Sequence, residues 1–186
     1  SLELQQAFIN DEDIHTRVAA DIYGISMGDV TKNMRKTAKA VIFGIVYGIS
    51  GFGLGENLEI SPKEAKMFID KYYELYPGVK NYMDNVIKDA KDKGYVRTLF
   101  NRKRVIDELQ SSNFMIRQGG ERIALNTPIQ GTSADIIKKA MVEIDKAFFY
   151  NDIKSKMLLQ IHDELVFDVL EEEKEKVGDL VKTIME

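Results

Sequence analysis

The sequence predicts a predominantly helical α+β fold with one antiparallel β-hairpin near its C-terminal end. Most of the 186 residues fall into segments of helical periodicity that begin at capping residues and stop at glycines. The exception is QIHDELVFDV at 160–169, where two strand-like apolar runs flank three ionisable residues. Apolar residues make up 44% and charged residues 30%, which is typical of a globular protein and not of a disordered one.

The first half of the chain predicts four main helices with local start and stop signals. The clearest start is SPKE at 61–64, a capping box in which Ser61 caps, Pro62 opens the first turn and Glu64 reaches back. Thr31 is a second predicted N-cap. The predicted helices span Asp11–Tyr23, Lys32–Tyr47, Ser61–Leu75 and Val79–Lys93, with Gly24, Gly48 and Gly94 as stops and a turn with a short helix in the glycine-rich stretch 49–58.

The second half mixes short strands with longer helices. YVRTLF and KRVID predict a short basic hairpin at 95–106 that turns at Asn101-Arg102. Two helical stretches follow, Ser112–Gln130 and Gly131–Phe149, with a bend near Pro128. Strands at 155–161 and 165–170 flank the HDE residues, and the last helix, Glu171–Met185, begins with three glutamates, as the helix dipole favours.

The charge of the chain is segregated along the sequence. A net charge of −4 argues weakly against a nucleic-acid-binding domain, because such domains are usually basic. Two stretches, 32–39 and 97–104, nevertheless carry four basic residues each and no acid, whereas 163–186 holds nine acids against three lysines. The total therefore conceals two basic segments that could meet an anionic ligand.

Several classes of protein are disfavoured by what the sequence lacks. Cysteine is absent, which excludes disulfides and thiolate metal sites and fits a reducing compartment. The longest apolar run, 40–49, is too short to span a bilayer, and no secretory signal precedes it. We expect a cytoplasmic protein with no membrane partner.

His162, Asp163 and Glu164 allow two interpretations. In a continuous strand, His162 and Glu164 would share one face and Asp163 the other, while at a hairpin tip all three would be accessible. They could be polar residues gathered at a solvated turn. Alternatively, they present a carboxylate to a divalent cation such as Mg²⁺, which takes few carboxylates and leaves positions for phosphate oxygens. The tripeptide alone does not decide between these.

Four residues of the segment 32–47 recur every fourth position: Arg35, Lys39, Phe43 and Tyr47. Each step of four drifts only about 40° around a helix, so the four side chains form a slowly winding stripe, cationic first and aromatic afterwards. The stripe could be part of a core helix with a solvated basic end. It also suits a nucleotide, with phosphates on the cations and sugar and base against the rings. His15 on the preceding helix could add a donor.

A second stripe lies in ERIALNTPIQGTSAD at 121–135. Arg122, Asn126 and Gln130 lie four residues apart among apolar neighbours. Their side chains offer donors to the minor-groove acceptors that every base pair displays at similar places, so they could check pair geometry without reading sequence. Helix capping and interhelix hydrogen bonds are the alternative.

Taken together, these segments resemble the family A DNA polymerases, the bacterial DNA polymerase I group. The resemblance rests on DIHTRVAADIYG, RKTAKAVIFGIVYGIS, GYVRTLFNRKR, ERIALNTPIQGTSADIIKKAM and LLQIHDELVFDV, which occur in family order and cover nearly the whole chain. Several motifs in register make it far more specific than HDE alone. It implies that residues 1–112 form the fingers, including the basic hairpin, and that 113–186 form part of the palm with the HDE hairpin.

The resemblance also implies roles for individual residues. His15, Arg35 and Lys39 would contact the triphosphate, Phe43 the incoming sugar and Tyr47 the region of the templating base. Arg122, Asn126, Gln130 and His162, with Arg102 and Arg104 of the basic hairpin, would contact primer-template DNA. Asp163 would hold catalytic Mg²⁺ at a two-metal site, with Glu164 beside it and Lys39 assisting the chemistry. The apolar strands around HDE would then fix this carboxylate in place.

The chain departs from the family pattern at four positions and lacks some of its segments. Ile42 stands where asparagine is usual, Gly119 where an aromatic is common, and Val105 and Asp107 where tyrosine and proline are usual. No part of the chain resembles the first palm motif, the thumb or the final palm segment. We therefore expect a polymerase fragment that is inactive alone, because two-metal phosphoryl transfer needs carboxylates on both sides of the metal pair.

Three functions remain open from the sequence. The first is a template-directed DNA polymerase that acts on deoxynucleoside triphosphates. The second is a nucleic-acid-binding module that has lost the chemistry, against which the retention of Asp163 and Glu164 argues. The third, a metal hydrolase using HDE, is disfavoured because two histidines in the whole chain cannot build a histidine-rich site. A truncated palm also predicts exposed apolar side chains at Val166, Phe167 and Leu170, and hence self-association.

Overall fold

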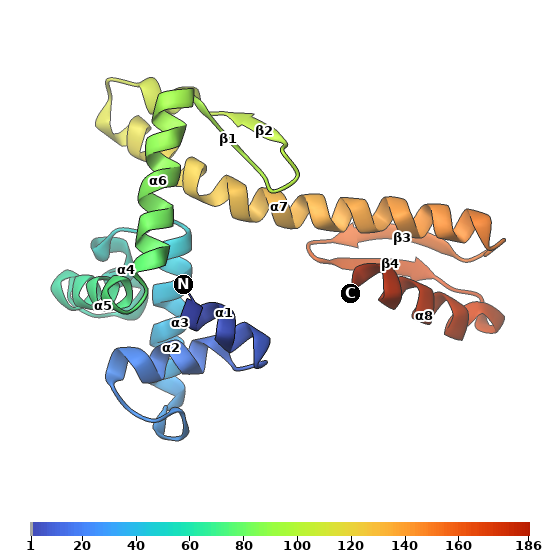
Figure 1. Cartoon of the computed structure of the whole chain (residues 1–186), viewed down its shortest axis with the longest axis horizontal. Helices are drawn as coiled ribbons and strands as arrows, with labels where there is room; N and C mark the ends of the chain where they lie inside the picture. Colours follow the sequence, from blue (N-terminus) through green and yellow to red (C-terminus); the bar gives the residue numbers. More distant parts are fainter. Residues whose placement is uncertain (1) are drawn as a thin grey trace. The chain divides into compact units, whose positions relative to one another are not determined.

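The computed structural model describes residues 2–186, which divide into two compact units (Figure 1). Unit 1 comprises the chain up to Val96 together with Lys103–Thr127, and unit 2 comprises Arg97–Arg102 and Pro128–Glu186. Helices dominate, and the strands that the structure describes form two separate antiparallel hairpins. The predicted α+β class is therefore confirmed, and with it the hairpin that carries HDE.

The element order closely follows the predicted one. The elements are α1 (Leu2–Ile9), α2 (Ile14–Tyr23), η1 (Met27–Asp29), α3 (Lys32–Val46), α4 (Gly51–Leu58), α5 (Pro62–Leu75), α6 (Pro77–Lys93), β1 (Tyr95–Arg97), β2 (Lys103–Val105), η2 (Asp107–Gln110), α7 (Phe114–Tyr150), β3 (Lys156–Ile161), β4 (Glu164–Asp168), η3 (Glu171–Glu173) and α8 (Lys174–Met185).

Side chains cap the helices of unit 1 where the sequence indicated. The hydroxyl of Thr31 accepts a hydrogen bond from the Met34 amide at 3.3 Å at the start of α3. At α5 both halves of the capping box form: the Glu64 amide donates to the Ser61 hydroxyl, and the Ser61 amide donates to the Glu64 carboxylate. These bonds satisfy amides that have no partner within the helix, so each helix begins at a fixed residue.

The core of unit 1 joins the helix carrying the stripe to its neighbours. Buried side chains of α2, α3, α4 and α5 form its centre, among them Val18, Val41, Leu54 and Tyr72. Beside it, the hydroxyl of buried Tyr76 donates to Asp21 of α2, and burial followed by this carboxylate raises the pKa of Tyr76. Helices α2 and α3 are thus held by packing on one side, which leaves their other side for the stripe.

Unit 2 is built on the second half of α7, the β3–β4 hairpin and α8. Its core contains Ile144 and Phe148 of α7 and Val177 of α8, with Leu165 and Phe167 of β4 packed against them. Glu173 joins the start of the hairpin to the segment before α8 by polar contacts. Its carboxylate accepts hydrogen bonds from the amides of Lys154 and Ser155 at 2.9 and 2.8 Å and from the Ser155 hydroxyl at 2.6 Å.

The β3–β4 ladder contains one bulge. Lys156 and Met157 pair with Asp168 and Phe167, but the next pair joins Leu159 to Val166. Leu158 is therefore an extra residue with no partner on β4. The ladder ends at the pair Ile161 and Glu164. His162 and Asp163 therefore form the turn, with His162 in the left-handed region at a φ of 54°.

The structure corrects three expectations about these elements. Helix α7 continues through Pro128, so the predicted pair of helices is a single one. The hydroxyls of Thr127 and Thr132, on either side of Pro128, donate to the carbonyls of Ile123 and Pro128 one turn back. Pro77 begins α6 directly after α5, so the predicted start at Val79 is two residues late.

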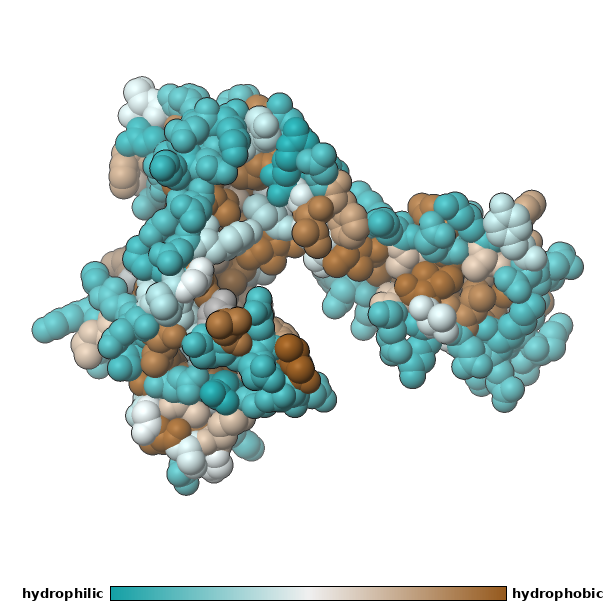
Figure 2. All heavy atoms as spheres, viewed as in Figure 1, coloured by the Kyte–Doolittle hydropathy of each residue, from teal (hydrophilic) through white to brown (hydrophobic). Residues whose placement is uncertain are grey.

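The structure also decides the arrangement of HDE, and its third correction concerns the exposed apolar side chains. Of the two arrangements considered for HDE, the hairpin tip is the one that occurs, because His162 and Asp163 lie in the turn. Phe167 is half-buried because it packs against the core of unit 2, and Val166 is also half-buried. The exposed apolar side chains belong instead to β3, with Leu158 57% exposed, and Figure 2 shows apolar surface gathered over the hairpin. Leu170, at 43%, is exposed as expected.

None of the helices within residues 2–186 is both long enough and apolar enough to cross a membrane.

Candidate functional site

The stripe of α3 forms as predicted and gathers five side chains in unit 1. The ring of Phe43 stacks on Tyr47 at a centroid distance of 6.1 Å and an interplanar angle of 11°. Lys39 lies above the same ring, with its Nζ 5.7 Å from the centroid, and His15 of α2 approaches from the other helix at 5.9 Å. Both Phe43 and Tyr47 are 42% exposed. Large aromatic rings exposed beside a cation form a surface for a planar, anionic ligand.

Arg35 opens the stripe and is held by Asp13. Its Nε and Nη2 groups donate to Asp13 Oδ2 at 3.0 and 2.7 Å, while Oδ1 of the same carboxylate accepts from the Thr16 amide at 2.9 Å and caps α2. The hydrogen bond from Arg35 and then that from the Thr16 amide lower the pKa of Asp13 to about 2. The carboxylate is therefore ionised at neutral pH, and the arginine is fixed relative to α2.

His15 is kept neutral by its surroundings. Burial is the largest cause that lowers its pKa from the usual 6.5, followed by the nearby positive charge of Arg35. Its Nδ1 is buried and has no hydrogen-bond partner in the part of the chain that the structure describes. A neutral imidazole can donate one hydrogen bond to an anionic oxygen without adding charge.

Arg122 and Asn126 of α7 belong to the same unit as the stripe. Gly48, just beyond α3, has a φ of +65°, and a Cβ placed on it would lie 3.1 Å from Arg122 Cγ. Glycine at this position thus permits the end of α3 to approach the arginine closely. The Oδ1 of Asn126 is buried and has no partner among residues 2–186, which leaves an acceptor unsatisfied. Gln130, on the same helix, is exposed and belongs to unit 2.

His162, Asp163 and Glu164 are all exposed at the hairpin tip of unit 2. The Gln160 amide group donates to the His162 carbonyl at 2.7 Å and tightens the turn. No cluster of three or more histidine, aspartate or glutamate side chains that could hold a metal ion occurs within the described residues. The tip therefore presents two adjacent exposed carboxylates, those of Asp163 and Glu164.

The two arginines predicted to bind DNA from the basic hairpin are engaged within the protein. In unit 2, Arg102 Nε donates to Asp135 Oδ1 at 2.6 Å and its Nη2 donates to the Gly131 carbonyl at 3.0 Å. Hydrogen bonding from Thr98 and then from Arg102 lowers the pKa of Asp135. In unit 1, Arg104 donates to the Thr127 hydroxyl at 3.3 Å. Both arginines thus join the hairpin loop or strand to α7.

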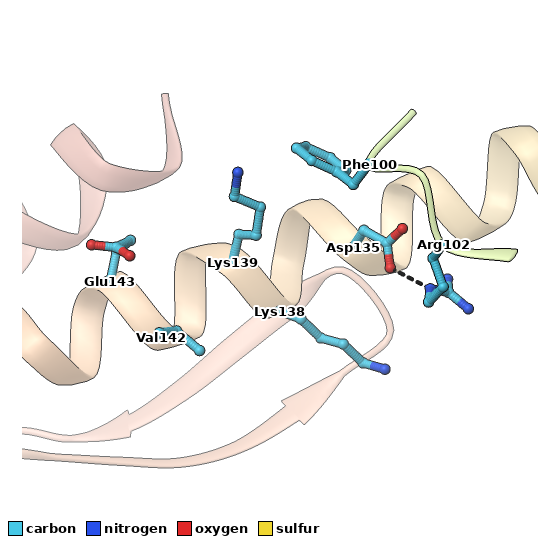
Figure 3. Close-up of a pocket in the computed structure, with 7 residues that line it drawn as sticks. All are labelled: Phe100, Arg102, Asp135, Lys138, Lys139, Val142 and Glu143. Atoms are coloured by element: carbon cyan, nitrogen blue, oxygen red, sulfur yellow. Dashed lines mark hydrogen bonds and ion pairs between the residues drawn. The ribbon is translucent and has the colours of Figure 1, made fainter. Parts of the chain in front are cut away.

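A cavity of about 340 Å³ lies beside Arg102 in unit 2 (Figure 3). Figure 3 shows Asp135 directed at Arg102, with Lys138 pointing away from Phe100 on the next turn of α7. Lys139 lies over the Phe100 ring, 4.4 Å from its centroid. Lys138 and Lys139 form no ion pair within residues 2–186, and they extend the positive charge of the hairpin along α7.

Sequence reasoning missed Asp13 and Asp135 as partners of the predicted arginines. Each lies far along the chain from its arginine, 22 and 33 residues away, so no local spacing could reveal the pair. The N-cap position of Asp13 was readable in principle, since Asp before an apolar periodic run is a helix start signal. Of the departures from the family pattern, Ile42 packs against the core of unit 1, and nothing lies within 4 Å of a Cβ placed on Gly119.

Comparison with known proteins gives consistent results. The family model described as DNA polymerase family A matches residues 2–186. DNA polymerase I of Bacillus caldotenax is 51% identical over 183 residues, which are 98% of this chain and 21% of that protein. DNA polymerase I of Streptococcus pneumoniae serotype 4 is 53% identical over 184 residues, 98% of this chain and 21% of that protein. The chain thus spans about a fifth of the length of these relatives.

A solved structure agrees with the fold. The POL domain of Pol1 from M. smegmatis, in complex with DNA primer-template and dNTP, superposes with a TM-score of 0.90 at 41% sequence identity. The match covers 97% of this chain and 32% of that chain.

Proposed function

The chain belongs to DNA polymerase family A, and on that premise we propose that it forms the fingers and part of the palm of a template-directed DNA polymerase. The single observation that carries the proposal is the stripe of unit 1, where His15, Arg35, Lys39, Phe43 and Tyr47 meet on adjoining faces of α2 and α3. Its order along α3, cations first and rings afterwards, matches the order of phosphates, sugar and base in a nucleotide.

Each member of the stripe has a role that follows from its chemistry. Arg35 and Lys39 bind the triphosphate by charge-assisted hydrogen bonds, and neutral His15 adds one donor. The ring of Phe43 packs against the sugar, and Tyr47 borders the base pair that forms with the template. Lys39 lies between the phosphate and sugar ends, so it also offsets charge that develops on the leaving pyrophosphate.

The polar stripe of α7 is the proposed contact with duplex DNA. Arg122, Asn126 and Gln130 would donate to minor-groove acceptors, which occupy similar places in every base pair. The assignment is supported by the Oδ1 of Asn126, which has no partner among residues 2–186, so the protein does not hold this amide through that atom. His162 would contact the primer end. Arg102 and Arg104 would act through the hairpin that they anchor on α7.

Mg²⁺ is the proposed cofactor of the complete enzyme, and Asp163 the residue of this chain that holds it. When bound, the metal pair supplies charge stabilisation at the transferring phosphoryl group. Asp163 offers a carboxylate at a tip fixed by two paired strands, and Glu164 flanks it at the last ladder pair. Among the described residues, Asp163 and Glu164 could supply some of the ligands of such a site, but no complete ligand set is present.

The division into subdomains and the cellular site are also proposals. We assign residues 1–112 to the fingers and 113–186 to the palm, with primer-template DNA and deoxynucleoside triphosphates as partners. The compact units of the structure divide between Thr127 and Pro128, within α7. The part of α7 before Pro128 belongs to unit 1, where Leu125 lies in the core. The proposed palm would therefore begin with residues that pack against the fingers. The proposed location is the cytoplasm.

Two measurements test the proposed function. The chain should bind a deoxynucleoside triphosphate with chemical-shift changes confined to α2 and α3, and it should not extend a primer alone with Mg²⁺ and all four nucleotides. The complete polymerase that carries this segment should extend the primer, and Lys39→Ala should weaken its use of nucleotide. Binding of DNA without any response of α2 and α3 to nucleotide would favour the alternative, a nucleic-acid-binding module without chemistry.

A further inference from the structure

The carboxylate of Asp13 makes two different contacts with its two oxygens. Oδ1 accepts from the Thr16 amide and caps α2, and Oδ2 accepts two hydrogen bonds from Arg35 of α3. Because the cap is part of the helix, the carboxylate that receives Arg35 is itself held in one position. The side chain of Asp13 therefore joins the N-terminal end of α2 to the first turn of α3.

The guanidinium of Arg35 retains donors after this contact. Asp13 occupies the edge formed by Nε and Nη2, and Nη1 has no partner elsewhere in residues 2–186. A guanidinium is a rigid planar fork, so fixing one edge also fixes the direction of the donors on the other. His15 is two residues beyond Asp13, in the first turn of the helix that Asp13 caps.

We propose that Asp13 is a positioning residue of the nucleotide site, which holds Arg35 so that its remaining donors meet the triphosphate. The inference rests on the proposed function, because it assigns a role to Arg35 at that same site. Asp13 itself would touch no substrate. It sets the angle of the arginine and, through its cap, the start of the helix that carries His15.

Two physical effects of Asp13 oppose each other, and their sizes decide the outcome. Its negative charge partly offsets that of Arg35, which weakens attraction to phosphate. On the other hand, the Arg35 side chain is 45% exposed and would otherwise lose rotamer freedom when the ligand binds. Salt and water strongly screen the repulsion between the exposed Asp13 carboxylate and a phosphate. Screening does not reduce the entropy that the Arg35 side chain loses when it is ordered. We therefore expect positioning to outweigh competition, by about 2- to 10-fold in nucleotide affinity.

The test compares substitutions that keep the cap with one that removes it. Asp13→Asn and Asp13→Ser retain good N-cap residues and lose the ion pair with Arg35. In the complete polymerase that carries this segment, both should raise the KM for a deoxynucleoside triphosphate about 2- to 10-fold with kcat nearly unchanged. Asp13→Ala should raise it further because α2 also loses its cap. Asp70→Asn, which breaks the pair with Lys66 on α5, is the matched control and should leave KM unchanged.

A double-mutant cycle separates positioning from a purely structural role. In an Arg35→Ala background, Asp13→Asn should have no further effect on KM, since the residue that it positions is gone. An equal effect in both backgrounds, or a KM that falls in Asp13→Asn, would overturn the inference. If Arg35→Ala raises KM and Asp13→Asn does not, only the role of Asp13 is wrong. If Arg35→Ala itself leaves KM unchanged, the proposed nucleotide site fails and the role of Asp13 fails with it.

Discussion

Lys39 lies one helical turn from both Arg35 and Phe43, and its ammonium group is 5.7 Å from the centre of the Phe43 ring. The lysine is therefore aligned over an exposed ring and has no carboxylate bound to it among the described residues. Arg35 differs in this respect, because Asp13 already occupies one of its edges. The full charge of Lys39 remains available to an anionic ligand.

The first prediction is that Lys39→Ala impairs nucleotide use far more than Lys36→Ala. Loss of a charge-assisted contact should cost about 1.5–3 kcal/mol, or about 10- to 150-fold in kcat/KM. Lys36 is also exposed, but it points about 100° around the helix from Arg35 and lies off the stripe. The measurement is kcat and KM for one nucleotide on one primer-template in the complete polymerase. Equal losses at the two lysines would show that another face of α3 meets the substrate.

The second prediction concerns acid. The pKa of Asp13 is lowered from 3.8 to about 2 by Arg35 and the Thr16 amide, so the stabilisation of unit 1 by this group is present above about pH 4. This stabilisation should be lost as the pH falls from about 4 towards 2, because Asp13 then becomes protonated in the folded protein as well as in the unfolded one. A carboxyl-detected NMR titration should show Asp13 titrating near pH 2 in the native protein and clearly higher in Arg35→Ala. An unchanged titration in that variant would mean that the ion pair does not form in solution.

The third prediction is that Gly48→Ala destabilises the protein by roughly 1–2 kcal/mol, the cost of a left-handed conformation for a residue with a Cβ. The added carbon would also lie 3.1 Å from Arg122 Cγ and 3.3 Å from Leu125 Cδ1, so the arginine must shift. Urea unfolding measures the first effect. Gly119→Ala in α7 is the control: nothing lies within 4 Å of its Cβ position, and it should be neutral or stabilising.

The fourth prediction is that the isolated chain self-associates through β3. Its side chains Leu158, Leu159 and Ile161 are 57, 47 and 48% exposed, next to a strand edge that is unpaired among residues 2–186. Sedimentation velocity over a wide concentration range should show dimers or larger species. Ile161→Lys should reduce them, whereas Phe8→Lys, which changes an even more exposed apolar residue on α1, should not. A monomer at every concentration would contradict the prediction.

Local signals were enough to predict most of unit 1. The capping box at Ser61, the N-cap at Thr31 and the stop at Gly94 act within four residues, so their energetics do not depend on the rest of the fold. The same holds for the stripe, because helical periodicity alone places Lys39 next to Phe43. Helix α1 (Leu2–Ile9) was not predicted.

Contacts between distant residues were not predictable from spacing. The pairing of Asp13 with Arg35 depends on how α2 packs on α3, and that of Arg102 with Asp135 on where the hairpin loop meets α7. At Pro128, the sequence predicted two helical stretches with a bend, whereas α7 is a single helix from Phe114 to Tyr150. At HDE, the two apolar runs were correctly predicted as strands on either side of the tripeptide, although Glu164 proves to be the first residue of β4.

The extra residue in β3, Leu158, determines which single-codon deletions the hairpin can tolerate. Removing the codon for Leu158 would leave Met157 opposite Phe167 and Leu159 opposite Val166, now as consecutive rungs of an uninterrupted ladder. Every remaining side chain would keep its face, and Asp163 would stay at the tip. Removing the codon for Gln160 instead would shift the strand by one place and turn its apolar side chains to the opposite face. Within this hairpin, Leu158 is thus the position where a frame-preserving deletion does least harm.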